Sequence, residues 1–138
     1  MKPTDTALLV VAQVAKADGR LDEAEREYLR KLLDDTGSEL TVDALLAVAG
    51  NRDLKELAGS VESYADRFAI ALQAYLMAFV DWNLDASEKG LYDELVELLG
   101  IERGDLEIIA ATEVKLRTPD GVPDHPRITE LIGASSFA

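Results

Sequence analysis

Two short acidic segments of this 138-residue chain share one pattern, D-x-x-L-D-x-x-E, at an offset of 63 residues. The first runs from Asp18 to Glu25 and the second from Asp81 to Glu88. Each segment keeps three carboxylates in register while the residues between them change: Asp18, Asp22 and Glu25 in the first, and Asp81, Asp85 and Glu88 in the second. Carboxylates at this spacing can begin a helix, or they can bind a cation.

Four of these six carboxylates fit a purely structural role. If Asp22 caps a helix, Glu25 is the third residue of that helix, which is the spacing of a capping box. Asp85 and Glu88 repeat this spacing. A cap stabilises a helix by about 1 kcal/mol, and the helix dipole also favours acids in the first turn. The capping interpretation therefore needs no ligand.

Asp18 and Asp81 are the two acids that capping leaves unexplained. Each follows an apolar stretch, where a helix should end and where the helix dipole disfavours an acid. Aspartate tolerates turns, so a structural role remains open. Alternatively, a cation joins helix-end carbonyls to carboxylates on both sides of the turn. All the candidate ligands are oxygens, which favours Ca²⁺, Mg²⁺ or Mn²⁺, with Zn²⁺ as a further ion to test.

Other site chemistries find no support in the sequence. An EF-hand fails in the second segment, where Ala86 stands at the glycine position and Tyr92 at the closing glutamate position. His125 is the only histidine, and no partner motif for a hydrolytic triad accompanies it. The chain has no phosphate-binding glycine motif and no cysteine. We therefore expect a protein that is not an enzyme, with no catalytic residues.

Apolar residues recur at helical spacing along most of the chain, and strand-like alternation is absent, which predicts an all-α protein. Asp5 and Thr41 are the expected caps of the first and third helices. Gly37 and Gly100 close the helices that follow the acidic segments. Because each acidic segment joins two helical stretches, we expect a compact bundle of about seven helices built from two related hairpin halves.

The composition changes at Thr118. Three prolines follow it closely: Pro119, Pro123 and Pro126. Proline lacks a backbone donor and disfavours helix at the preceding residue. We therefore expect residues 1–118 to form a helical domain and residues 119–138 to form an extended or partly disordered tail. Three apolar residues in the tail could still dock on the core or on a second subunit: Ile128, Leu131 and Ile132.

Charge and hydropathy limit the partners. The chain has 27 acidic and 14 basic residues, a net charge of −13. Such a surface repels nucleic acid and attracts a basic or membrane-associated protein, and a homodimer stays open. The longest apolar run, residues 68–80, is too short to cross a bilayer, and Asp5 argues against a signal peptide. Without cysteine, a reducing cytoplasm is the expected location.

The segment from Val14 to Glu25 resembles the signature of the tellurite-resistance TerB family, and the segment from Asp81 to Ile101 is similar to the second half of that family. The resemblance covers most of the chain, about residues 5–116. It implies an all-helical domain with two related halves in a bacterial cytoplasmic protein linked to tellurite and related stress responses. It also implies metal binding through the six acids named above. The second segment departs by having Trp82-Asn83 where a glycine is usual.

Two functions from different classes follow. In the first, the protein is a non-enzymatic stress-response protein that binds a divalent cation through the paired acidic segments. In the second, it is an acidic helical interaction module in which these acids are only helix caps. A thermal melt with and without divalent ions separates the two, because a ligand that binds only the native state raises the midpoint.

Overall fold

The computed structural model describes residues 3–16, 23–78, 86–116 and 126–136, and the structural statements below concern these residues. They form eight α-helices and no strand, which confirms the predicted all-α class. In chain order the helices are α1 (Pro3–Ala15), α2 (Glu23–Asp35), α3 (Val42–Ala49), α4 (Leu54–Gly59), α5 (Tyr64–Ala78), α6 (Ala86–Leu99), α7 (Arg103–Leu116) and α8 (Pro126–Gly133).

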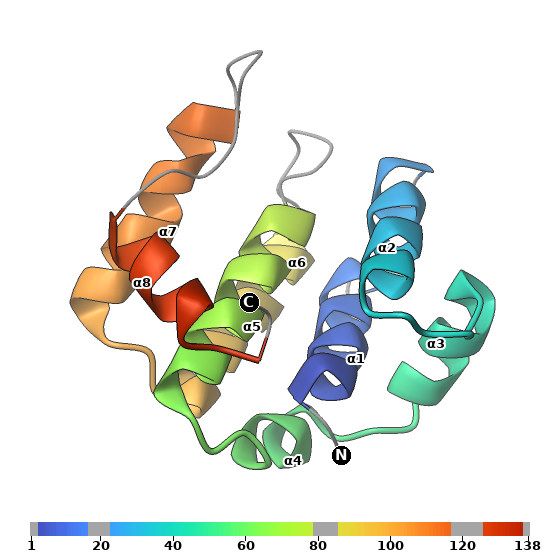
Figure 1. The fold of residues 1–138 in the computed structure, drawn as a ribbon. Helices are drawn as coiled ribbons and strands as arrows, with labels where there is room; N and C mark the ends of the chain where they lie inside the picture. The colour runs from blue at the N-terminus through green and yellow to red at the C-terminus, as the bar shows by residue number, and fades with distance from the viewer. Residues whose placement is uncertain (1–2, 17–22, 79–85, 117–125, 137–138) are drawn as a thin grey trace.

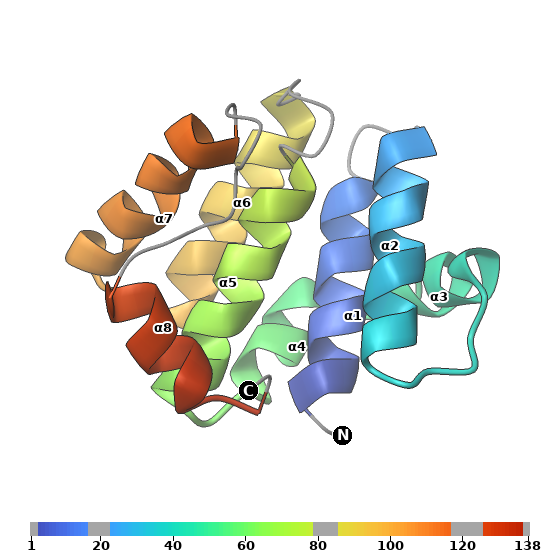
Figure 2. The same ribbon diagram turned by 45° about the horizontal axis from the view of Figure 1, so that its top comes forward.

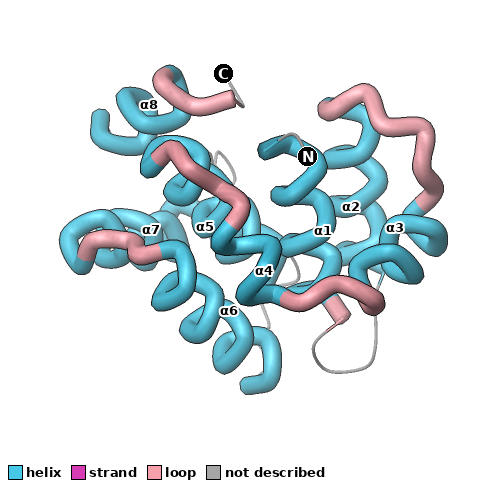
Figure 3. Tube along the Cα trace, turned by 90° about the horizontal axis from the view of Figure 1, so that it is seen from below, coloured by secondary structure: helices cyan, strands magenta, loops and turns pink. Residues whose placement is uncertain are grey.

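Helices α1 and α5 form the centre of the bundle. Helix α5 packs against α1, α6 and α8, while α1 also contacts α2, α3 and α4. Helices α1, α2, α5 and α6 run along a similar direction, with α3 on one flank and α7 and α8 on the other (Figures 1 and 2). In the view from below, α4 lies between α3 and α6 (Figure 3). The two central helices therefore connect both flanks of the molecule.

Both central helices are buried on nearly every side. Val10 and Val11 of α1 and Phe68 and Ile70 of α5 are fully buried, as the almost continuous apolar sequence of these helices predicts. Helix α2, in contrast, buries Leu29 and Leu33 and exposes its charged face, which is the pattern of an outer helix. The hairpin formed by α1 and α2 thus combines a core helix with a more exposed one.

Helices α2 and α6 end in the same way. Gly37 has φ 72° and Gly100 has φ 68°, in the left-handed region that glycine adopts at little cost. After α2, the amide of Ser38 donates to the carbonyl of Leu33 at 2.9 Å, which with the Gly37 bond to the α2 carbonyls forms a Schellman motif. The Ile101 amide and Gly100 repeat this arrangement after α6. Both predicted closing glycines are confirmed.

The helix ends keep the 63-residue offset of the acidic segments. Helices α1 and α5 end at Ala15 and Ala78, and helices α2 and α6 begin at Glu23 and Ala86. The elements around the two acidic segments therefore share one register along the chain. The idea that two related halves build the whole bundle extends beyond this agreement and stays a prediction.

One of the two predicted helix caps is confirmed. Thr41 precedes α3 in an extended conformation, and its hydroxyl accepts a hydrogen bond from the amide of Ala44 at 3.1 Å, as expected. Asp5 is not the cap of α1. That helix already begins at Pro3, which places Asp5 within its first turn. Proline suits a first helical position because its missing N–H has no partner there in any case.

The C-terminal residues also require a correction. We expected an extended tail, but residues 126–133 form α8, whose Ile128 and Leu131 are buried. Pro126 opens this helix instead of breaking it, again because the first helical position needs no N–H donor. The alternative expectation, that these apolar residues dock on the core, is confirmed by the packing of α8 on α5 and α7. The domain boundary at residue 118 stays a prediction.

Candidate functional site

The four helix ends that flank the acidic segments lie at one end of the bundle, which we call the acidic-segment end. Helices α1 and α5 finish there, and helices α2 and α6 begin there, in both views of the ribbon (Figures 1 and 2). The last turns of α1 and α5 present carbonyl oxygens, and the first turns of α2 and α6 present N–H groups. This end therefore offers oxygen ligands to a cation and also donors that a capping carboxylate can use.

The predicted cation ligands are placed only in part. Asp18, Asp22, Asp81 and Asp85 lie outside the described residues. Glu25 is the third residue of α2, and Glu88 holds the same position in α6, although the Glu88 side chain also lies outside the description. Among the described residues, no group of three or more acidic or histidine side chains is placed to hold a metal ion. The six-residue cation site stays a prediction.

Glu25 is the one predicted ligand whose side chain is described. It is only 3% exposed, although glutamate is normally a surface residue. Helices α2 and α6 begin directly after Asp22 and Asp85, so Glu25 stands where the capping-box interpretation puts it. Burial of a carboxylate is costly without compensating interactions. The position and the burial of Glu25 therefore suit both a cap and a ligand.

A groove of about 310 Å³ lies beside the end of α1 that leads into the first acidic segment. The Gln13 amide donates to the carbonyls of Ala49 and Arg52 at 3.0 and 2.8 Å, which fastens α1 to the end of α3. Lys16 and Arg52 supply the basic part of the lining, and Leu91 of α6 supplies an apolar part. Sequence analysis missed this groove because its two basic residues are far apart and belong to no motif.

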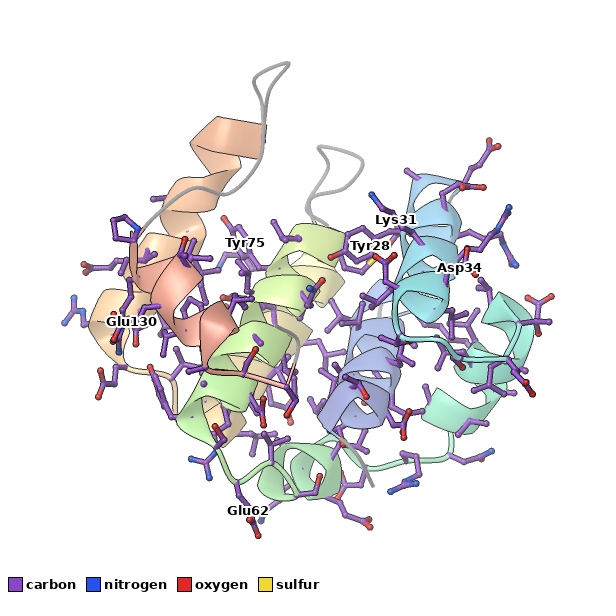
Figure 4. All side chains as sticks on the ribbon, viewed as in Figure 1. Tyr28, Lys31, Asp34, Glu62, Tyr75 and Glu130 are labelled. Carbon is purple, nitrogen blue, oxygen red and sulfur yellow. The ribbon has the colours of Figure 1, made fainter. Side chains whose placement is uncertain are left out.

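A second polar contact joins α2 to α5. The Tyr28 hydroxyl donates to Oε1 of Gln73 at 2.6 Å, and Figure 4 shows Tyr28 between the two helices. Burial raises the pKa of Tyr28, with a further contribution from the charge of Asp35. The tyrosine therefore stays protonated and acts as a hydrogen-bond donor between the first hairpin and the central helix. This contact holds in place two of the helices that form the acidic-segment end.

Comparison with known proteins identifies the class to which this architecture belongs. Residues 4–111 match the family model described as Tellurite resistance protein TerB. The match spans most of the 138 residues, and the chain belongs to the TerB family, which confirms the predicted resemblance. No curated protein and no solved structure matches the chain. No helix in the described part of the chain is long and apolar enough to cross a membrane.

Proposed function

We propose that this TerB-family protein is a non-enzymatic, cytoplasmic stress-response protein that binds a divalent cation at the acidic-segment end. The observation that carries the proposal is that four helix ends, two from each hairpin, lie at the same end of the bundle in one sequence register (Figure 1). Both D-x-x-L-D-x-x-E segments join helices at this end.

The chemistry of this end suits a hard cation. In the sequence, Asp18 and Asp81 come three residues after the last residues of α1 and α5, whose final turns have carbonyl oxygens without a helical partner. The negative charge of the acid and the negative end of the helix dipole repel each other. A bound cation would reduce this repulsion. The net charge of −13 also raises the local concentration of cations around the protein.

The double variant Asp18→Asn with Asp81→Asn tests this proposal. Asparagine keeps the turn tendency of aspartate but removes its charge. We expect millimolar Ca²⁺, Mg²⁺, Mn²⁺ or Zn²⁺ to raise the melting temperature of the parent, and we expect the variant to lose most of that rise. The matched control is Asp34→Asn with Glu97→Gln, two exposed acids near the other ends of α2 and α6. If parent and control show no rise with any of these ions, the cation function is wrong.

A second function, an acidic helical interaction module, is favoured by a different observation. Leu40, just before α3, and Val48, in the last turn of α3, are exposed large apolar side chains, at 45% and 42%. Contiguous exposed apolar side chains mark protein-binding surfaces, and in this function Leu40 and Val48 belong to such a surface. In that case a basic or membrane-associated protein is the expected partner, and the variant Leu40→Ser with Val48→Ser should weaken its binding without changing any response to cations.

A further inference from the structure

The groove beside the end of α1, which we call the α1–α3 groove, has no part in the proposed cation site. Its volume is about 310 Å³, at the lower end of the range for small-molecule sites. Helix α1 contacts both α3 and α6. The lining includes Ala12 and Lys16 from the end of α1, Ala49 and Arg52 from the end of α3, and Leu91 of α6.

Arg52 brings to this groove a positive charge that no described acid neutralises. The other described arginines each contact a carboxylate or a carbonyl oxygen: Arg26, Arg30, Arg67, Arg103 and Arg127. The partly buried Arg52 side chain makes no hydrogen bond or ion pair with a described residue, and neither does that of Lys16 in the same groove. In a chain with 27 acidic and 14 basic residues, two bases without acidic partners in one groove are unexpected.

The backbone that carries Arg52 is fixed by hydrogen bonds. Nε2 of Gln13 donates to the carbonyls of Ala49 and Arg52 at 3.0 and 2.8 Å, and the amide of Arg52 donates to the carbonyl of Ala49 at 3.1 Å. A ligand therefore has to order only the Arg52 side chain, which lowers the entropic cost of binding. The same bonds satisfy carbonyl oxygens at the end of α3 that would otherwise disfavour an anion.

The helix dipole explains only part of this arrangement. Lys16 follows α1 and Arg52 comes shortly after α3, and the negative end of a helix dipole favours a basic residue. That effect requires neither a groove nor an apolar lining. Here Ala12 and Ala49 are buried, and Leu91 is partly buried against the core, beside the two charges. Two like charges would also repel a divalent cation, so the groove differs in chemistry from the acidic-segment end.

We propose that the α1–α3 groove binds a small organic anion in which one carboxylate or phosphate group is attached to a short apolar chain. Lys16 and Arg52 bind the anionic group, which a guanidinium can contact through two parallel hydrogen bonds. Ala12, Ala49 and Leu91 contact the apolar chain. The net charge of −13 repels a large anion such as a nucleic acid, whereas a small anion responds mainly to the charges within a few ångströms of it.

Octanoate and octyl phosphate are the probes that test this site. Each is titrated into the full-length protein in metal-free buffer, and binding is followed by the shifts of the backbone amide signals. We expect saturable binding at millimolar concentration or below, with the largest shifts at Gln13, Gly50 and Arg52. Neutral 1-octanol lacks the charge and acetate lacks the chain, so each should bind at least about tenfold more weakly than octanoate. The comparison of the two probes shows which anionic group the groove prefers.

The variant Lys16→Gln with Arg52→Gln removes both charges of the groove. The bonds that fix Arg52 come from its backbone, so the variant should keep the fold of the parent. We expect it to bind either probe at least about tenfold more weakly. The matched control is Lys31→Gln with Arg103→Gln, which changes the net charge equally at two exposed positions outside the groove. This control should bind the probes as the parent does.

Four results would overturn the proposal. The parent could fail to bind either probe saturably, or it could bind 1-octanol as tightly as octanoate, which would mean apolar contact alone. The groove variant could bind as tightly as the parent, or the control could lose as much affinity, which would assign the effect to overall charge. If the double variant did not fold, Lys16→Gln alone, at an exposed position, should still weaken binding severalfold, and unchanged binding by this single variant would overturn the proposal as well.

Discussion

The two ends of α5 both gather acidic residues, but they use them differently. At the start of α5 and on the neighbouring α7, Asp66 and Asp105 are buried and accept hydrogen bonds from Ser136, Arg127 and Tyr64. Near the other end of α5, the acids belong to a repeated pattern that contains no repeated base, since Arg20 in the first segment corresponds to Asn83 in the second. The first group accepts hydrogen bonds from protein donors, whereas the two acidic segments share their acids but no basic residue.

This difference leads to a separation of effects. Changes on the α8 face should alter the stability of the metal-free protein and leave the response to cations unchanged. Changes in the acidic segments should alter the response to cations and leave the stability of the metal-free protein nearly unchanged. Residues that affected both properties equally would show that the two regions are not independent.

The largest effect is expected for Leu131→Ala on the α8 face. Removing a buried leucine side chain should lower the free energy of unfolding by about 2 kcal/mol, from lost burial and an unfilled cavity. Chemical denaturation with and without millimolar divalent ion measures both properties. Thr129→Ala, on an exposed position of the same helix, is the control and should change stability little. A reduced cation response in Leu131→Ala would show that the α8 face and the acidic segments are not independent.

A smaller, pH-dependent effect is expected for Asp105→Asn. Burial alone raises the pKa of Asp105, but the hydrogen bonds from Arg127 and Tyr64 and the charge of Arg127 outweigh it, so the native pKa is lowered. The ionised form therefore stabilises the fold at pH values above the unfolded pKa of about 3.9. That stabilisation is lost as the pH falls through the native value. The parent should therefore be more stable than the variant at pH 6, and the difference should begin to shrink as the pH falls below about 4. Denaturation curves at several pH values give the comparison, and a constant difference across this range would contradict it.

Local chemistry explains which parts of the fold the sequence predicts. The ends of α2 and α6 depend on Gly37 and Gly100, and a glycine that closes an apolar-periodic stretch is a signal contained in a few neighbouring residues. The cap at Thr41 also depends only on neighbouring residues, because its side chain bonds to the amide of Ala44. The start of α1 and the helical state of residues 126–133 were missed because proline at a first helical position looks, in sequence, like a helix breaker.

Long-range pairing explains what the sequence does not predict. Asp66 and Asp105 look like ordinary first-turn acids, and their partners Ser136 and Arg127 lie 70 and 22 residues away. The groove lined by Lys16 and Arg52 depends on the packing of α3 against α1, which no motif encodes. The acidic segments can be recognised in the sequence because repetition is visible without a structure, although most of their carboxylates lie outside the described residues.

The smallest effect on metal-free stability is expected for Asp22→Ser with Asp85→Ser. Serine and aspartate are similar helix caps, so the loss should stay within about 0.5 kcal/mol per site. Serine, however, offers a hydroxyl where a hard cation prefers a charged carboxylate. This variant therefore keeps the capping role of the acidic segments and removes two of the proposed ligands.

Calorimetric titration of the parent and of this serine variant with Ca²⁺, Mg²⁺, Mn²⁺ and Zn²⁺ tests the central claim most directly. We predict that the parent binds at least one of these ions at millimolar concentration or below, and that the variant, with a metal-free stability close to that of the parent, binds it at least tenfold more weakly. If the parent binds none of the ions, or if the variant binds as tightly as the parent, the acidic segments are helix caps and the cation function is refuted.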